Sequence, residues 1–209
     1  MKYEWKKQDK SLYLPQAKPE LVTVPGFNYF MLEGLGNPNS DLFSETVGVL
    51  YSLAYAAKML PKKGKLPAEG YYDYSVFPLE GVWDLTEEGK QKDVLDKDEL
   101  LYTLMIRQPE FVTADLAAEI LETVKLTKPH VLMEKALFGK VEEGLSVQML
   151  HYGSYDDEPE SFAVMEDYCI QNGLKRASKT HREIYLTDAR RTRPDKLKTV
   201  LRFKVKRTE

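Results

Sequence analysis

The stretch at residues 179–188, KTHREIYLTD, carries the side chains that are best suited to chemistry. Its residues alternate as in a half-buried strand, with Ile184 and Leu186 on one face and Glu183 on the other. An unpaired carboxylate is costly to remove from water, and glutamate is rarely buried without a partner. Either Glu183 points to solvent, or it lies in a cleft where its charge or its proton is used.

A second group of aromatic and titratable side chains, on the same or neighbouring strands and loops, is predicted to bind a ligand. These residues are Tyr185, Trp83, Glu80, Phe77, His151, Tyr152 and Tyr155. Tyr185 shares the face of Glu183 and could stack on a ligand or donate a hydrogen bond to it. Tyr152 and Tyr155 flank Gly153 in a predicted loop.

Three of these side chains also have a purely structural interpretation. Trp83 could line a ligand groove, or it could pack in the core at the end of a strand. Glu80 could be a second carboxylate of the site, although an ion pair in a turn is the more common role. His151 could carry a proton, although a lone histidine on a strand is more often simply hydrogen-bonded.

The elements that must position these residues form an internal repeat. The order strand, glycine-containing loop, helix, strand, hairpin and strand occurs twice, over about residues 20–107 and 140–206. The predicted elements of the first copy are a strand at 21–34, a helix at 43–60, and strands at 71–77 and 100–107. Those of the second copy are a strand at 145–152, a helix at 158–172, and strands at 179–187 and 197–206. A further helix is predicted at 113–125.

This pattern predicts an α+β fold with two β-α-β-β modules in a single domain over residues 1–209. The first strands should pair into one antiparallel sheet, with both helices on one face and a ligand groove on the other. In this arrangement Ile184 and Leu186 face the helices, whereas Glu183 and Tyr185 face the groove. The corresponding register of the first copy also turns Phe77 toward the groove.

Composition excludes several classes of function. A hydrophobic content of 43%, a charged content of 30% and a net charge of −3 describe an ordinary globular protein without a nucleic-acid footprint. The single Cys169 cannot form an internal disulfide, and the three scattered histidines do not suggest a zinc site. Neither a membrane span nor a signal peptide is visible, so we expect a cytoplasmic protein with no metal and no cofactor.

Four stretches carry a resemblance to a known family. They are LYLPQAKPELVTVPGFNYFMLEGLGNPN, YDYSVFPLEGVWD, VQMLHYGSYDDEP, and HREIYLTD followed by KLKTVLRFKVK. With these stretches in this order, the chain resembles the GyrI-like small-molecule-binding family, which includes the effector-binding domains of MerR-type multidrug-sensing regulators. The resemblance implies two β-α-β-β modules around a ligand groove.

The resemblance also implies a role for Glu183. In drug-sensing relatives, a buried glutamate of an E-I-Y-like motif on the penultimate strand meets the positive charge of aromatic cations, and Glu183 is the matching position. Some free-standing members are implied to be hydrolases that open the cyclopropane rings of DNA-alkylating compounds, with this glutamate acting on water. The expected partner is therefore a lipophilic, aromatic, often cationic small molecule. A protein-binding inhibitor, acting through an acidic surface, and a ligand sensor without catalysis are the alternatives.

Overall fold

The computed structural model describes residues 2–208 and divides them into two compact units. One unit consists mainly of residues 27–141, with a short N-terminal segment that ends at Glu4. The other consists of residues 5–26 together with the chain from Glu142 onward. In the described part of the chain, no helix has the length and apolar character that a membrane crossing requires.

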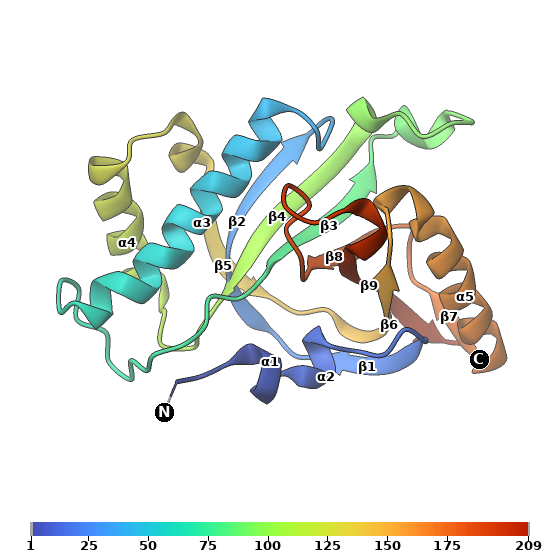
Figure 1. The fold of residues 1–209 in the computed structure, drawn as a ribbon, viewed down its shortest axis with the longest axis horizontal. Helices are drawn as coiled ribbons and strands as arrows, with labels where there is room; N and C mark the ends of the chain where they lie inside the picture. Colours follow the sequence, from blue (N-terminus) through green and yellow to red (C-terminus); the bar gives the residue numbers. More distant parts are fainter. Residues whose placement is uncertain (1, 209) are drawn as a thin grey trace. The chain divides into compact units, whose positions relative to one another are not determined.

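The first unit contains the first β-α-β-β module (Figure 1). Its strands are β2 (Phe27–Leu35), β3 (Leu79–Leu85), β4 (Leu100–Gln108) and β5 (Leu137–Val141). Its helices are α3 (Asp41–Lys62), α4 (Ala114–Thr127), and the 3-10 turns η1 (Gly89–Gln91), η2 (Lys97–Glu99) and η3 (Val131–Lys135). The strands pair antiparallel in the order β3-β4-β2-β5, and α3 packs on β2 and β4. The Ser40 hydroxyl caps α3 by accepting a hydrogen bond from the Phe43 amide.

The second unit contains the second module, in the same order of elements. Its strands are β1 (Glu20–Val24), β6 (Gly144–Tyr152), β7 (Leu174–Arg176), β8 (His181–Tyr185) and β9 (Lys198–Arg207). Its helices are α1 (Trp5–Gln8), α2 (Lys10–Tyr13), α5 (Glu158–Gln171), and the 3-10 turns η4 (Tyr155–Asp157) and η5 (Pro194–Lys196). The strands pair antiparallel in the order β1-β6-β9-β8, and β7 pairs with the end of β9.

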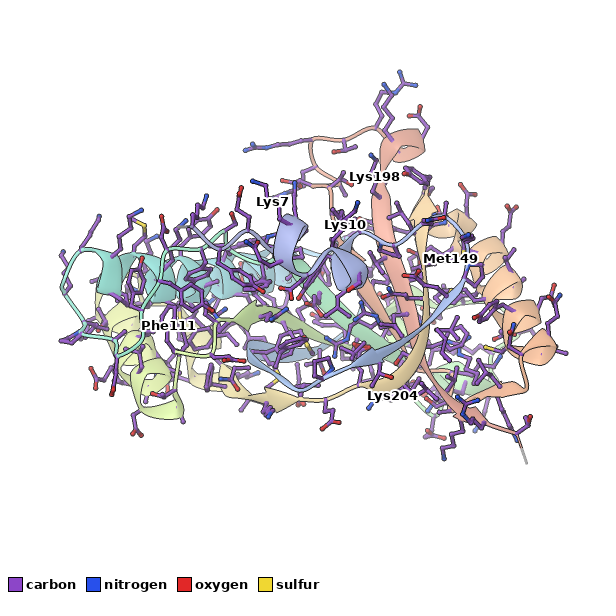
Figure 2. All side chains as sticks on the ribbon, turned by 90° about the horizontal axis from the view of Figure 1, so that it is seen from below. Lys7, Lys10, Phe111, Met149, Lys198 and Lys204 are labelled. Atoms are coloured by element: carbon purple, nitrogen blue, oxygen red, sulfur yellow. The ribbon has the colours of Figure 1, made fainter. Side chains whose placement is uncertain are left out.

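Two opposite faces of the second sheet are both buried. On one face, Met149 (labelled in Figure 2) and Leu201 pack in a hydrophobic cluster with Met165 and Cys169 of α5. Because Glu183 lies directly opposite Leu201 in the β8–β9 register, its side chain shares this face. The helix α5 therefore covers the face that carries Glu183.

The other face of this sheet holds a buried polar network. Glu143 forms an ion pair with Arg182, whose Nε lies 3.1 Å from the carboxylate, and it accepts a hydrogen bond from Arg202 Nη1 at 3.0 Å. Arg202 also donates to the Gln148 side chain and to the Leu12 carbonyl. These contacts satisfy charges that would be costly to bury alone, and they attach the N-terminal segment to β6 and β9.

The predicted α+β class and the repeated β-α-β-β order are confirmed, but two details of the prediction are wrong. The second strand of the first module, β3, begins at Leu79, not at residue 71, and Glu80 lies in this strand and not in a turn. Residues 71–77 form only one isolated bridge, Tyr74 to Tyr3. Their alternating aromatic residues instead surround Phe111, which is in ring contact with three tyrosines: Tyr71, Tyr72 and Tyr74.

The second error concerns the faces of β8. Ile184 was expected to face the helix of its module and Glu183 the opposite side, but Glu183 lies on the face that α5 covers. Ile184 is fully buried on the other face, opposite Val200. The alternation correctly separates the two sets of side chains, but it does not indicate which set lies under the helix.

Candidate functional site

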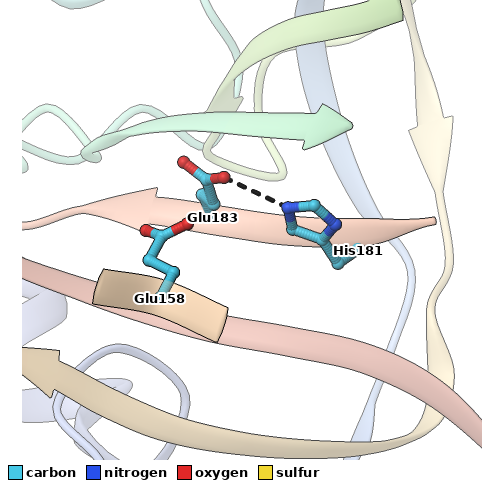
Figure 3. Close-up of side chains that lie close together, drawn as sticks. All are labelled: Glu158, His181 and Glu183. Carbon is cyan, nitrogen blue, oxygen red and sulfur yellow. Dashed lines mark hydrogen bonds and ion pairs between the residues drawn. The ribbon is translucent and has the colours of Figure 1, made fainter. Parts of the chain in front are cut away.

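The first turn of α5 brings a second carboxyl group to Glu183. Glu158 is the first residue of α5, and its carboxyl group lies close to that of Glu183 on β8 (Figure 3). Only 6% of Glu158 and 8% of Glu183 are exposed. The helix can begin here because Pro159, at its second position, lacks an N–H that would have no partner within the helix. The contact is therefore made between residues 25 positions apart, from a helix start and a strand.

Two buried carboxyl groups in contact cannot both be ionised at low energetic cost. Burial and the charge of Glu183 raise the pKa of the Glu158 carboxyl far above the ordinary 4.5 of a glutamate, and Asp156 adds to this shift. Burial beside a second carboxyl group therefore disfavours the ionised form of Glu158.

One oxygen of the Glu158 carboxyl group is enclosed without a hydrogen-bond donor among the described residues. This oxygen, Oε1, is buried, and no described protein group lies within hydrogen-bond distance of it. Buried polar atoms in native proteins nearly always have a partner, so an unsatisfied carboxyl oxygen needs an explanation. A water molecule or a polar atom of a ligand would satisfy it.

His181 holds the other member of the pair. Its Nε2 lies 3.1 Å from Glu183 Oε1, two residues along the same face of β8. The imidazole also packs edge-on against Phe162 of α5, with 4.8 Å between the ring centroids. Figure 3 shows the ring directed at the Glu183 carboxylate. The contact with His181 thus orients the Glu183 carboxylate.

Aromatic side chains lie beside the carboxyl pair. The rings of Tyr155 and Tyr185 meet edge to face, with 6.0 Å between their centroids. Enclosure of the phenol, followed by the charge of Glu183, raises the pKa of Tyr155 to about 12. Tyr155 therefore stays neutral over the physiological range and lies close enough to Glu183 to feel its charge.

The same cluster contains the ligand types of a metal site. Glu158, His181 and Glu183 each offer one ligand atom, and these three atoms lie within 4.8 Å of one another. A proton or a cation can reduce the repulsion between two adjacent carboxylates. The pattern of histidines and the cysteine does not reveal this cluster, because glutamates supply two of its three groups.

The other predicted residues of the second unit have different surroundings. His151 uses both ring nitrogens, Nδ1 with Ser161 Oγ at 2.9 Å and Nε2 with the Ser154 carbonyl at 3.0 Å. This matches its interpretation as a simply hydrogen-bonded histidine. Tyr152 is 54% exposed and lies under the Lys198 ammonium.

Three predicted residues belong to the first unit, where all are buried. Trp83 packs between the rings of Phe43 and Tyr102, as expected of a core tryptophan. Glu80 is 1% exposed and lies in β3. Phe77 packs against the guanidinium of Arg107. A ligand role for these three residues stays a prediction.

Comparison with known proteins gives a consistent result. The family model that describes the "GyrI-like small molecule binding domain" matches residues 17–206. A solved hydrolase from Listeria innocua is 35% identical, covers 98% of this chain and 100% of its own, and superposes with a TM-score of 0.89.

A second Listeria innocua structure, of an uncharacterized conserved protein, is 36% identical over 98% of this chain and 100% of its own, with a TM-score of 0.90. The C-terminal domain of EcmrR, at 11% identity and a TM-score of 0.52 over 94% of this chain and 99% of its own, shares the fold. No curated protein sequence gives a significant match.

Proposed function

Because the chain belongs to the GyrI-like small-molecule-binding family, we propose that its ligand is a hydrophobic, aromatic and often cationic compound held at Glu183. We further propose that electrophilic ligands, such as those with a cyclopropane ring, are hydrolysed there as a detoxification. The Listeria innocua hydrolase, which matches over the full length of its chain, supports the second part of this proposal.

The observation that carries the proposal is a pair of buried carboxyl groups that lie close together beside aromatic rings. Glu183 is 8% exposed, so its charge acts in a medium that screens it far less than water does. Tyr155 and Tyr185 lie beside it, and each aromatic face would add about 0.5–2 kcal/mol to the binding of a cation. A lipophilic cation would meet a countercharge and aromatic surface at one place.

The same carboxylate can act as a general base. Glu183 is held by His181 on one side and lies close to Glu158 on the other, so its free lone pairs are oriented. A water molecule hydrogen-bonded to Glu183 would lose its proton as its oxygen attacks an electrophilic carbon. A strained three-membered ring would supply the driving force for opening.

Product analysis by mass spectrometry tests the proposal. Wild type, Glu183→Gln and the control Glu160→Gln, which changes an exposed glutamate of the same helix turn, are incubated with aromatic cations and cyclopropane-bearing alkylators. We expect wild type and Glu160→Gln to add water to the alkylators, and Glu183→Gln to lose turnover about 100-fold or more. Turnover retained by Glu183→Gln would contradict the role of Glu183 as base.

Thermal unfolding with the same compounds separates the remaining outcomes. A ligand that binds only the folded state raises its stability. A compound that raises the unfolding temperature of the wild type but is not itself changed would therefore indicate a binding protein or sensor without catalysis. If the compounds neither protect the protein against unfolding nor are converted by it, the result would favour a protein-binding inhibitor.

A further inference from the structure

We propose that Glu158, His181 and Glu183 form a binding site for a divalent transition-metal ion such as Zn²⁺. This inference shares Glu183 with the proposed function but does not depend on it, because metal binding is measured without an organic ligand. The sequence alone does not indicate the site, since two of its ligands are glutamates 25 positions apart.

Two elements of regular structure bring the three side chains together. His181 and Glu183 stand two residues apart on β8, so their side chains project from the same face of the strand. Glu158 comes from the first turn of α5. One ligand atom of each side chain lies within 4.8 Å of the other two, and Figure 3 shows the three groups gathered in one place. Ligands carried by a strand and a docked helix are held more precisely than ligands on loops.

The separation of the ligand atoms suits a small transition-metal ion. His181 Nε2 lies 3.1 Å from Glu183 Oε1. Two ligands that are each about 2 Å from a tetrahedral Zn²⁺ ion lie about 3.3 Å apart, so both of these atoms can contact one ion. An imidazole nitrogen favours Zn²⁺ over Ca²⁺ and Mg²⁺, which take oxygen ligands. Three protein ligands would leave the fourth position of the ion to water or to a bound compound.

The charge of the cluster also favours a cation. Glu158 is 6% exposed and Glu183 is 8% exposed, and in the part of the chain that the structure describes neither pairs with a lysine or an arginine. Buried charges in proteins are paired or coordinate metals, because an uncompensated charge is costly to remove from water. An ion bound by both carboxylates would compensate them together.

The enclosed oxygen of Glu158 is an independent observation that points to a bound ion. Its Oε1 is buried and receives no hydrogen bond from the described residues, and an ion is one of the partners that satisfy such an atom. The ion would lie between its ligands, so the oxygen does not have to be open to solvent to contact it. A proton shared by the two carboxyl groups would compensate their charge alone, whereas an ion would also use the imidazole of His181.

Equilibrium dialysis against Zn²⁺, followed by elemental analysis, tests the site. Wild type and the control Glu160→Gln, which changes an exposed glutamate of the same helix turn, should each bind one ion per chain at this site. We expect the Kd to rise about 100-fold or more in Glu158→Gln and in His181→Ala, because the loss of a group that only supports a metal ligand already costs about 10–100-fold. With Co²⁺ in place of Zn²⁺, the visible absorption bands of the wild type should be lost in both variants.

Two results would overturn the inference. Equal Zn²⁺ binding by all four proteins would place the ion elsewhere on the chain, and no binding by the wild type would leave a shared proton to compensate the carboxyl pair. Competition with an aromatic cation separates the inference from the proposed function. Displacement of Zn²⁺ by the cation would support both, since both need Glu183. A cation that binds without displacing Zn²⁺ would refute its proposed place at Glu183 and leave the metal site intact.

Discussion

Glu158 and Glu183 illustrate how the surroundings of a residue set its chemistry. Both are glutamates with nearly equal exposure, 6% and 8%. His181 contacts Glu183, whereas burial and nearby carboxylates act on Glu158. Two identical side chains on neighbouring elements therefore have different electrostatic surroundings.

The shifted pKa of Glu158 also predicts how stability depends on pH. Between the pKa of an unfolded glutamate and the higher pKa of folded Glu158, the folded protein keeps a proton that the unfolded chain releases. Wild-type stability should therefore fall as pH rises through this window, by at most about 1.4 kcal/mol per pH unit for one proton. Glu158→Gln has no such proton.

We expect the free energy of unfolding of Glu158→Gln, minus that of wild type, to rise steadily from pH 5 to pH 8. Urea unfolding of both proteins at each pH measures this difference. Parallel stability curves would show that Glu158 titrates alike in the folded and unfolded chains. Glu160→Gln, which changes an exposed side chain, should follow the wild-type curve.

At the scale of elements, the helix α5 builds the site because it is docked on the sheet. Met165 is fully buried and packs with Met149, Leu201 and Phe203. About two turns earlier along the helix, Glu158 lies close to Glu183 of β8. The position of Glu158 therefore depends on apolar packing further along α5.

Substitution of Met165 tests this dependence. Met165→Ala should destabilise the fold by about 2–5 kcal/mol, because it removes a buried side chain and leaves a cavity. Ile170→Ala, at a position that is 77% exposed on the same helix, should change stability by less than about 0.5 kcal/mol. Denaturant unfolding measures both values, and similar small effects would show that α5 is not packed as described.

The extent to which the sequence predicts these elements depends on whether local pattern or tertiary packing decides. Alternation and helical spacing correctly predict β8, β9 and α5, because these elements bury one or both faces along their length. The face of Glu183 could not be predicted, since both faces of β8 are buried and carry polar residues, Arg182 and Glu183.

Glu158 was missed for a related reason. In the sequence it stands in an acidic run, DDEPE, which is typical of a solvated helix start, where carboxylates suit the helix dipole. Only the packing of α5 against β8 shows that one member of this run is buried. Residues 71–77 are the opposite case, in which a clear local pattern predicts a strand that does not form. Alternating aromatic residues are typical of a strand, but here they pack their rings around Phe111.

At the scale of the whole molecule, one compact unit is built from two segments that lie far apart in the sequence. The described residues 5–26 pack with those from Glu142 onward, and residues 27–141 form the other unit. The Arg202 guanidinium donates to the Leu12 carbonyl, and the Gln148 amide donates to the Ser11 carbonyl, across most of the chain length. Glu143 neutralises the arginines at the centre of this network.

Loss of this charge should weaken the second unit more than the first. Glu143→Gln removes the carboxylate that pairs with the buried Arg182 and Arg202, and we expect it to cost about 3–5 kcal/mol of stability. The control Glu142→Gln changes an exposed neighbour and should have little effect.

Hydrogen–deuterium exchange locates this effect, because local opening exposes the amides of the weakened part first. In Glu143→Gln, we expect faster exchange at the Leu150 amide, which donates to the Gln16 carbonyl, and along β6 and β9. The amides of β2 and β4 should exchange as in the wild type, since they pair within the other unit. Equal acceleration in β2 and β4 would show that the chain opens as a single cooperative body, and the carboxyl pair would then depend on the packing of both units.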